Sequence, residues 1–198
     1  MDSHGEALLD LVDARRGHFL LESGHHGGLW LDLDPLFVDV RRIRPLVDAF
    51  SATLRPYAVD AVCGPLLGGA FLAQLVASAL DVEFLFTERE IPLGSTGLYQ
   101  ARYRLRPALA ARAKGRRVAI VDDVMSAGSA LRGTYEALTL HGAHPIAAGA
   151  LLVLGTVGAS YFAERGVPVE ALARETYELW PPEGCPLCAA KIPVESFR

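Results

Sequence analysis

Residues 118–129 read VAIVDDVMSAGS, and they are the most informative stretch of this chain. An unbroken apolar run, Val118 to Val121, predicts a buried strand. Two carboxylates, Asp122 and Asp123, come next, followed by small residues and a helix predicted from about Ser129 to His141. Adjacent carboxylates can accept hydrogen bonds from two sugar hydroxyls, and backbone N–H groups at a helix start favour a phosphate. The stretch therefore predicts a site for a phosphorylated sugar.

Alternating strands and helices extend outward from this stretch. Apolar runs at 59–63, 82–86 and 145–154 predict further strands, and the first of them opens through Gly64–Gly69 into a helix. Nearly continuous apolar strands separated by helices indicate an α/β fold, with a parallel twisted sheet and helices on both faces. Ligands of such sheets bind beyond the carboxyl ends of the strands, which is where both polar loops are expected.

The two ends of the chain are expected to add to this core. Ser3 and Glu6 form a capping box that predicts a first helix ending near Gly17, and the runs at 19–21 and 29–33 predict a hairpin around a polar turn. We expect a single domain over residues 1–198, with its core at about 38–172, a small hood from the N-terminal hairpin (about 1–37) and the C-terminal tail (173–198), and a mobile arm at about 88–106.

Composition excludes several classes of function. A net charge of −4 gives no electrostatic footprint for nucleic acid, so no nucleic-acid partner is expected. Residues 146–163 carry no charge, but glycines interrupt them, which favours a buried strand and turn over a membrane span. The N-terminus lacks the pattern of a signal peptide, and three cysteines form no disulfide framework. We therefore expect a cytoplasmic protein without a membrane partner.

The order of strand, acidic pair, small-residue loop and helix resembles the signature of the type I phosphoribosyltransferases. That resemblance implies that Asp122 and Asp123 hold the ribose of phosphoribosyl pyrophosphate and that Arg89, on the arm, takes part in catalysis. It also implies Mg²⁺ as cofactor, held by substrate oxygens and waters with no direct protein ligand, and a homodimer. The implied 5′-phosphate site comprises Val124, Met125, Ser126, Ala127, Gly128 and Ser129, and the implied pyrophosphate loop comprises Gly64, Pro65, Leu66, Leu67, Gly68 and Gly69.

Three further segments are similar to the orotate-using members of that family. They are a strand and turn at 19–24 that includes Ser23, the segment 86–90, and a tail with LWPP at 179–182 and CPLC at 185–188. The similarity implies transfer of ribose 5-phosphate to orotate, giving orotidine 5′-phosphate and pyrophosphate in pyrimidine biosynthesis. Two alternatives stay open, a transferase for another base and a regulatory protein that binds phosphoribosyl pyrophosphate without turnover.

The sequence also departs from the orotate enzymes in three places. Glu22 stands where they usually carry a lysine, residues 91–100 contain neither lysine nor histidine, and residues 154–158 lack an expected arginine. Because orotate is an anion, lost cations should weaken its binding and the neutralisation of the leaving group. Four arm residues could replace the missing charges: Arg89, Arg102, Arg104 and Arg106.

The pair Cys185 and Cys188 has the spacing of half a zinc site. A structural zinc needs four ligands, and the chain contains no second cysteine pair, so ordinary thiols are expected here. His25 and His26 are expected to lie in a flexible surface turn.

Overall fold

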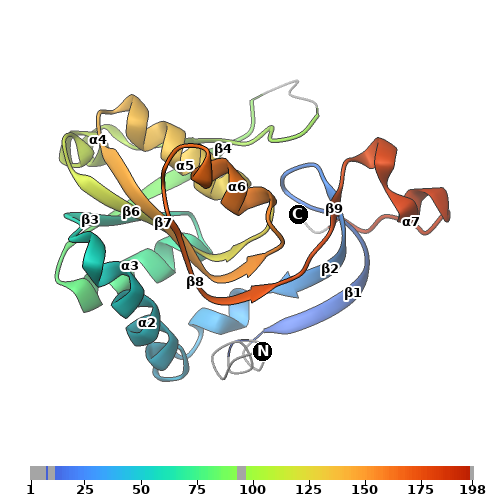
Figure 1. Ribbon diagram of the computed structural model, residues 1–198, viewed down its shortest axis with the longest axis horizontal. Helices are drawn as coiled ribbons and strands as arrows, with labels where there is room; N and C mark the ends of the chain where they lie inside the picture. Colours follow the sequence, from blue (N-terminus) through green and yellow to red (C-terminus); the bar gives the residue numbers. More distant parts are fainter. Residues whose placement is uncertain (1–7, 9–11, 93–96, 197–198) are drawn as a thin grey trace.

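The computed structural model describes residues 8, 12–92 and 97–196. A six-stranded sheet forms the core, in the strand order β5-β4-β3-β6-β7-β8 (Figure 1). Its strands are β3 (Ala61–Pro65), β4 (Glu83–Glu90), β5 (Arg102–Arg104), β6 (Arg117–Met125), β7 (His144–Leu154) and β8 (Val169–Glu175). Neighbouring strands pair in parallel except β5, which pairs antiparallel with β4. The expected α/β fold is confirmed.

Helices cover both faces of this sheet. The helices are α2 (Val40–Leu54), α3 (Gly68–Leu80), α4 (Pro107–Ala113), α5 (Ser129–Leu140) and α6 (Val157–Ala163). Alternate residues of β6 enter two different cores. Ala119 and Val121 pack with α2 and α3, whereas Val118 and Ile120 pack with α4, α5 and α6. All four side chains are fully buried, which explains why this strand reads as a continuous apolar run.

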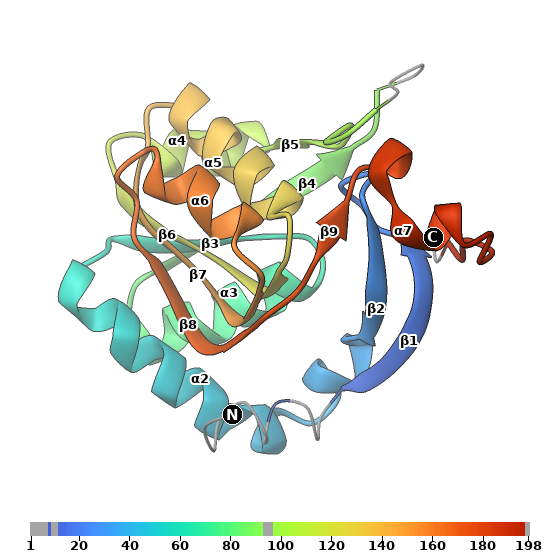
Figure 2. The same ribbon diagram turned by 45° about the vertical axis from the view of Figure 1, so that its right-hand side comes forward.

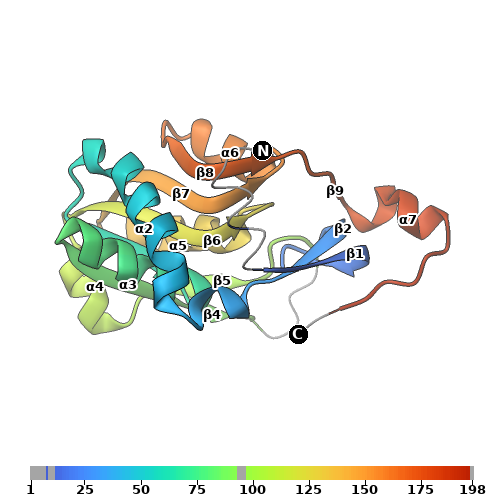
Figure 3. The same cartoon turned by 90° about the horizontal axis from the view of Figure 1, so that it is seen from below.

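A second, three-stranded sheet forms the hood, and both ends of the chain contribute to it (Figure 2). β1 (Asp13–Leu20) pairs antiparallel with β2 (His26–Asp32), and β2 pairs with β9 (Leu179–Trp180). The short elements η3 (Pro182–Gly184) and α7 (Pro186–Ala189) follow, and Glu195 then bridges to Phe19 on β1. Figure 3 shows the hood strands extending from one end of the central sheet. On the chain, the short helices η1 (Asp34–Phe37) and η2 (Arg55–Tyr57) flank α2.

Two local predictions need correction. The first helix was expected to end near Gly17, but Asp13–Leu20 is a strand. Pairing with β2 outweighs the local helical pattern there. Of the residues before Asp13, only Leu8 and Val12 belong to the described part of the chain. Asp122 and Asp123 were expected after the strand, but β6 continues through them to Met125, since β7 is long enough to pair with that extension. No helix within the described ranges is long and apolar enough to cross a membrane.

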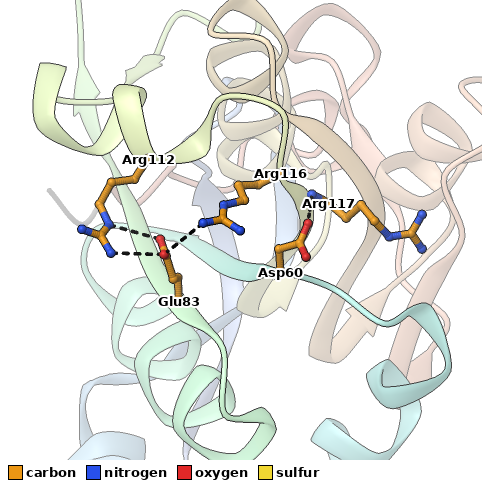
Figure 4. A network of polar contacts seen from close by, with 5 residues as sticks. All are labelled: Asp60, Glu83, Arg112, Arg116 and Arg117. Atoms are coloured by element: carbon orange, nitrogen blue, oxygen red, sulfur yellow. Dashed lines mark hydrogen bonds and ion pairs between the residues drawn. The ribbon is translucent and has the colours of Figure 1, made fainter.

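The amino ends of three neighbouring strands are tied by charged side chains (Figure 4). Asp60 precedes β3, and its carboxylate accepts the backbone N–H of Arg117 at 2.8 Å, at the start of β6. Glu83, which begins β4, accepts hydrogen bonds from Arg112 and Arg116. These contacts fix the strand starts at one edge of the sheet, and the opposite edge carries the polar loops.

Candidate active site

A cavity of about 280 Å³ lies at the carboxyl edge of the sheet, between the core and the hood. Its walls come from four parts of the chain. The hood supplies Leu21, Glu22, Leu29, Trp30, Leu31, Leu33 and Tyr177; the loop after β3 supplies Pro65, Leu66, Leu67, Gly68 and Gly69; β5 supplies Tyr103; β6, β7 and the start of α5 supply Asp122, Asp123, Val124, Ser126, Gly128, Ser129, Ala130 and Leu154. The expected acidic pair and both expected loops therefore meet in one place.

The two aspartates are almost buried, with exposed fractions of 9% for Asp122 and 8% for Asp123. Each carboxylate accepts the next backbone N–H along the strand. Asp122 Oδ1 lies 3.1 Å from the nitrogen of Asp123, and Asp123 Oδ1 lies 2.7 Å from the nitrogen of Val124. These bonds orient both side chains, which also share a hydrogen bond with each other.

Gly68 and Gly69 let the loop after β3 approach these carboxylates closely. A Cβ on Gly68 would lie 2.0 Å from Asp123 Oδ2, and one on Gly69 would lie 2.6 Å from Asp122 Oδ1. Gly64 is needed for a related reason, since its Cβ would lie 2.0 Å from the carbonyl oxygen of Gly69. The sequence GPLLGG is therefore adapted to contact with the acidic pair.

Burial raises the pKa of Asp122 well above its usual range, and the neighbouring Asp123 raises it further. The pKa of Asp123 is raised as well, chiefly by burial. Two like charges in a buried place disfavour full ionisation, so the pair shares its protons as a unit. A ligand that donates hydrogen bonds or brings positive charge would favour the doubly ionised form.

The loop between β6 and α5 has the form of an anion cradle. Gly128 adopts a left-handed backbone (φ +72°) directly before α5, which turns the chain around the helix start. Gly158 of α6 donates its N–H to the carbonyl of Ser126 at 3.0 Å and so supports the loop from behind. Met125 and Ala127 are buried beneath it and pack in the core, whereas Ser126 and Ser129 face the cavity.

Glu22 connects the hood, the arm and this loop. Its Oε1 accepts the hydroxyl of Tyr103 at 2.7 Å and that of Ser129 at 3.4 Å, and its Oε2 lies 3.7 Å from Nε of Arg89. The Tyr103 ring packs directly against Gly133 on α5, where a Cβ would lie 2.4 Å from the ring. An acidic side chain of the hood thus contacts the arm and the start of α5.

The arm folds back over the hood of the same chain. The backbone N–H of Tyr99 donates to the carbonyl of Ser23 at 2.9 Å, and a Cβ on Gly24 would lie 2.9 Å from the carbonyl oxygen of Gly97. The Tyr99 ring lies under the Arg132 guanidinium, 4.4 Å from ring centroid to Cζ. Residues 93–96, the middle of the expected arm, lie outside the described part.

Comparison with known proteins identifies the family. The model of the phosphoribosyl transferase domain matches residues 42–182. The chain belongs to the phosphoribosyltransferase family. It is 31% identical over 181 residues to the orotate phosphoribosyltransferase of Thermotoga petrophila, covering 90% of this chain and 88% of that one. It is 30% identical over 179 residues to the orotate phosphoribosyltransferase of Thermus thermophilus, covering 90% and 91%.

Solved phosphoribosyltransferases share the fold. The structure of orotate phosphoribosyltransferase from Aeropyrum pernix aligns with a TM-score of 0.65 at 22% identity, covering 86% of this chain and 93% of that one. Adenine phosphoribosyltransferase from Trypanosoma brucei aligns with a TM-score of 0.68 at 16% identity, covering 87% and 80%. These likenesses confirm the type I architecture.

Some residues that the family resemblance singled out lie away from the cavity. Ser23 is buried, and its hydroxyl contacts Nδ1 of His25 at 3.0 Å. Arg104 and Arg106 form ion pairs with Glu88, so their contacts lie within the arm. His25 and His26 are 8% and 7% exposed, so the expectation of a flexible surface turn is wrong; pairing of β2 with β9 and the packing of Tyr99 enclose them.

Sequence reasoning missed most of the hood wall. Trp30 and Tyr177 line the cavity from β2 and from the segment between β8 and β9, and Tyr103 lines it from β5. Trp30 belongs to the LWLD stretch of the predicted hairpin, whereas Tyr103 and Tyr177 have no motif around them. They reach the cavity through the tertiary fold, which no local sequence pattern reveals.

Replacing Asp122 by asparagine should stabilise the unliganded phosphoribosyltransferase. A carboxyl whose pKa is raised by folding contributes its stability at low pH and loses it as the pH rises through the folded value. Asp122→Asn should therefore raise the unfolding temperature by a few degrees at pH 7–8, and the gain should shrink toward pH 4. Thermal unfolding across pH measures this, with the exposed Asp48→Asn as control. A gain that is the same at every pH, or a loss at pH 8, would contradict the assignment of a buried, raised carboxyl.

Proposed function

We propose that this chain transfers ribose 5-phosphate from phosphoribosyl pyrophosphate to orotate, giving orotidine 5′-phosphate and pyrophosphate. One observation carries the proposal: the acidic pair of β6, the loop before α5 and the loop after β3 line a single cavity beneath the hood. The choice of orotate as the base rests on the orotate phosphoribosyltransferases that are about 30% identical over 90% of the chain.

The donor has a place for each of its groups. Asp122 and Asp123 both line the cavity, and they accept hydrogen bonds from the two ribose hydroxyls in place of the hydrogen bond that they share with each other. Residues 124–129 bind the 5′-phosphate through backbone N–H groups and the hydroxyls of Ser126 and Ser129, at the positive end of the α5 dipole. The loop 64–69 binds the pyrophosphate beside the ribose.

Chemistry at the sugar follows from the charges in the cavity. Departure of pyrophosphate leaves positive charge on the anomeric carbon, and the orotate nitrogen forms the new bond there. The carboxylates of Asp122 and Asp123 stabilise that developing cation. The pKa values of both carboxyls are raised in the free protein. Positive charge that appears beside them lowers these pKa values and so favours the ionised form that stabilises the cation.

The balance of charge fits a magnesium cofactor. Among the described residues that line the cavity, three are acidic (Glu22, Asp122 and Asp123) and none is basic. A polyanionic donor alone would meet repulsion there, whereas oxygen ligands from carboxylates and phosphates are those that Mg²⁺ prefers. Bound with the donor, Mg²⁺ supplies positive charge to the leaving pyrophosphate. Arg89 is the arm cation that we assign to the leaving group, because its Nε lies 3.7 Å from Oε2 of Glu22 in the cavity wall.

A test of the proposal measures pyrophosphate release with Mg²⁺ and phosphoribosyl pyrophosphate, adding orotate, adenine or no base. Orotate-dependent release is expected, and it should fall by roughly 100-fold or more in kcat/KM in Asp123→Asn, which retains an acceptor for the Val124 N–H. Release with adenine alone would assign another base. Binding of the donor without release for any base would favour a regulatory protein.

Gly68→Ala should damage the donor site more than the fold. The added methyl group must displace the Asp123 carboxylate, which its Cβ would otherwise meet at 2.0 Å, and a shift of about 1 Å in a positioning group can cost roughly 100-fold in rate. Gly28→Ala is the matched control, because its nearest neighbour, the Gly17 carbonyl oxygen, is 4.0 Å away. Steady-state kinetics and thermal unfolding of both variants separate the two effects. Equal kinetics in the two variants would exclude the proposed role of this loop.

Glu22→Gln should strengthen binding of the donor. In the free protein the Glu22 carboxylate engages Ser129 and Arg89, which the proposal assigns to the substrate. Glutamine keeps an acceptor for the Ser129 hydroxyl but loses the charge that holds Arg89 and repels the donor, so the affinity for phosphoribosyl pyrophosphate should rise roughly threefold to tenfold. Calorimetry measures this, with Glu90→Gln, an arm glutamate outside the cavity lining, as control. Weaker binding would mean that Glu22 itself helps to hold the donor.

Two further expectations stay predictions. The family resemblance predicts a homodimer, and composition predicts a cytoplasmic location.

A further inference from the structure

Four side chains outside the cavity converge at the far end of the hood. They are His18 on β1, His26 at the start of β2, and Cys185 and Cys188 around α7, and their ligand atoms all lie within 4.8 Å of one another. Nε2 of His18 lies 2.8 Å from Nδ1 of His26 and 3.3 Å from Sγ of Cys185. Sγ of Cys188 lies 3.4 Å from Nδ1 of His26 and 3.8 Å from Nε2 of His18. The count of cysteines in the sequence did not include these two histidines, which the fold brings beside the cysteine pair.

The backbone explains how residues so distant in sequence meet. The register of β1 against β2 shifts between Arg16 and Phe19, so that β1 carries one residue more than β2 and His18 lies within this bulge. His26 begins β2, opposite Trp180 of β9, which brings the C-terminal tail alongside. Cys185 and Cys188 are three residues apart across the first turn of α7, where such residues share one side.

The spacing of the four atoms fits a tetrahedral metal site. With metal bonds of about 2.3 Å to sulfur and about 2.0 Å to nitrogen, tetrahedral ligand atoms lie about 3.3–3.8 Å apart. The sulfur–nitrogen distances given above, from 3.3 to 3.8 Å, fall in this range. The two histidine nitrogens, at 2.8 Å, need to move apart by about half an ångström.

A hydrogen bond behind His18 sets its ring for this role. Nδ1 of His18 lies 2.7 Å from the carbonyl oxygen of Ile192. A carbonyl oxygen can only accept, so Nδ1 carries the proton and Nε2 of the neutral ring presents its lone pair to the cluster. Metal-binding histidines characteristically donate their second ring nitrogen to a carbonyl or carboxylate in this way.

The tail needs such an attachment. Among residues 181–196, all of which the structure describes, Cys185 alone is buried, at 3% exposure. Backbone contacts to the hood come from the segment after α7, where Glu195 bonds with His18 and Leu20. Apolar burial therefore contributes little to holding this segment in place.

We propose that His18, His26, Cys185 and Cys188 bind one zinc ion, which fastens the C-terminal tail to the N-terminal hairpin. Two thiolates and two imidazoles form a tetrahedral donor set of the kind that zinc takes in structural sites. All four positions are filled by protein, so the ion has no place for a substrate and its role is structural. The zinc site shares no residue with the cavity lining, so this proposal does not depend on the proposed reaction.

The zinc content of the full chain tests this, after purification without a polyhistidine tag, exposure to zinc and removal of loosely bound metal. About one zinc per chain is expected by elemental analysis. Cys188→Ser and His26→Ala should lose most of it, whereas the matched controls Cys63→Ala, in the core, and His141→Ala, on the surface, should retain it. Zinc absent from the unsubstituted chain, or retained equally by all four variants, overturns the proposal. A Cys185–Cys188 disulfide in the freshly reduced, zinc-exposed protein would overturn it as well.

Two more readouts test the geometry and the role. Cobalt in place of zinc should show the visible absorption of a tetrahedral thiolate site, and Cys188→Ser should alter that spectrum. Removing zinc with a chelator should speed tryptic cleavage after the exposed Lys191 and lower the unfolding temperature, with no such change in Cys188→Ser. Cleavage after Lys191 that is insensitive to bound zinc would overturn the fastening role.

Discussion

Two neighbouring carboxylates, almost buried at the end of a core strand, are the constraint around which the site is arranged. Asp122 and Asp123 repel one another in a place where water screens them little, and no basic residue of the described lining offsets them. The strand holds them through the N–H groups that follow, and glycines clear the space in front. The free protein tolerates this arrangement because the raised pKa values let the pair share a proton, and a ligand with hydroxyl donors and a metal cation would relieve it. Stability and function oppose each other at these two residues.

The parts of the fold that could be predicted are those whose signal is local. The apolar runs of β3, β4, β6 and β7 predicted a parallel sheet, since a strand covered on both faces has no polar side. The order of strand, acids, small residues and helix predicted where the acidic pair and the loop before α5 meet. Even here the boundary was wrong by a few residues, because the length of β7 decides how far β6 extends past Asp123.

The hood could be predicted only in part, because long-range contacts build it. The hairpin followed from its turn, but β1 begins at Asp13, where the local pattern favoured a helix. His18, His26, Cys185 and Cys188 are separated by up to 170 residues, and counting cysteines alone gave half a site. Glu22 is similar: the sequence showed an acid in place of a lysine, but its three partners lie on β4, β5 and α5 and no spacing predicts them.

The partners of Glu22 also bear on how a phosphate can reach the loop before α5. One carboxylate contacts Ser129, Tyr103 and Arg89 together, so the serine hydroxyl is already engaged within the protein before any phosphate arrives. A hydroxyl has a single hydrogen to donate, so under the proposed reaction a phosphate that accepts from Ser129 competes directly with Glu22 for it. The tyrosine and the arginine are the partners that Glu22 keeps when the serine turns to the ligand.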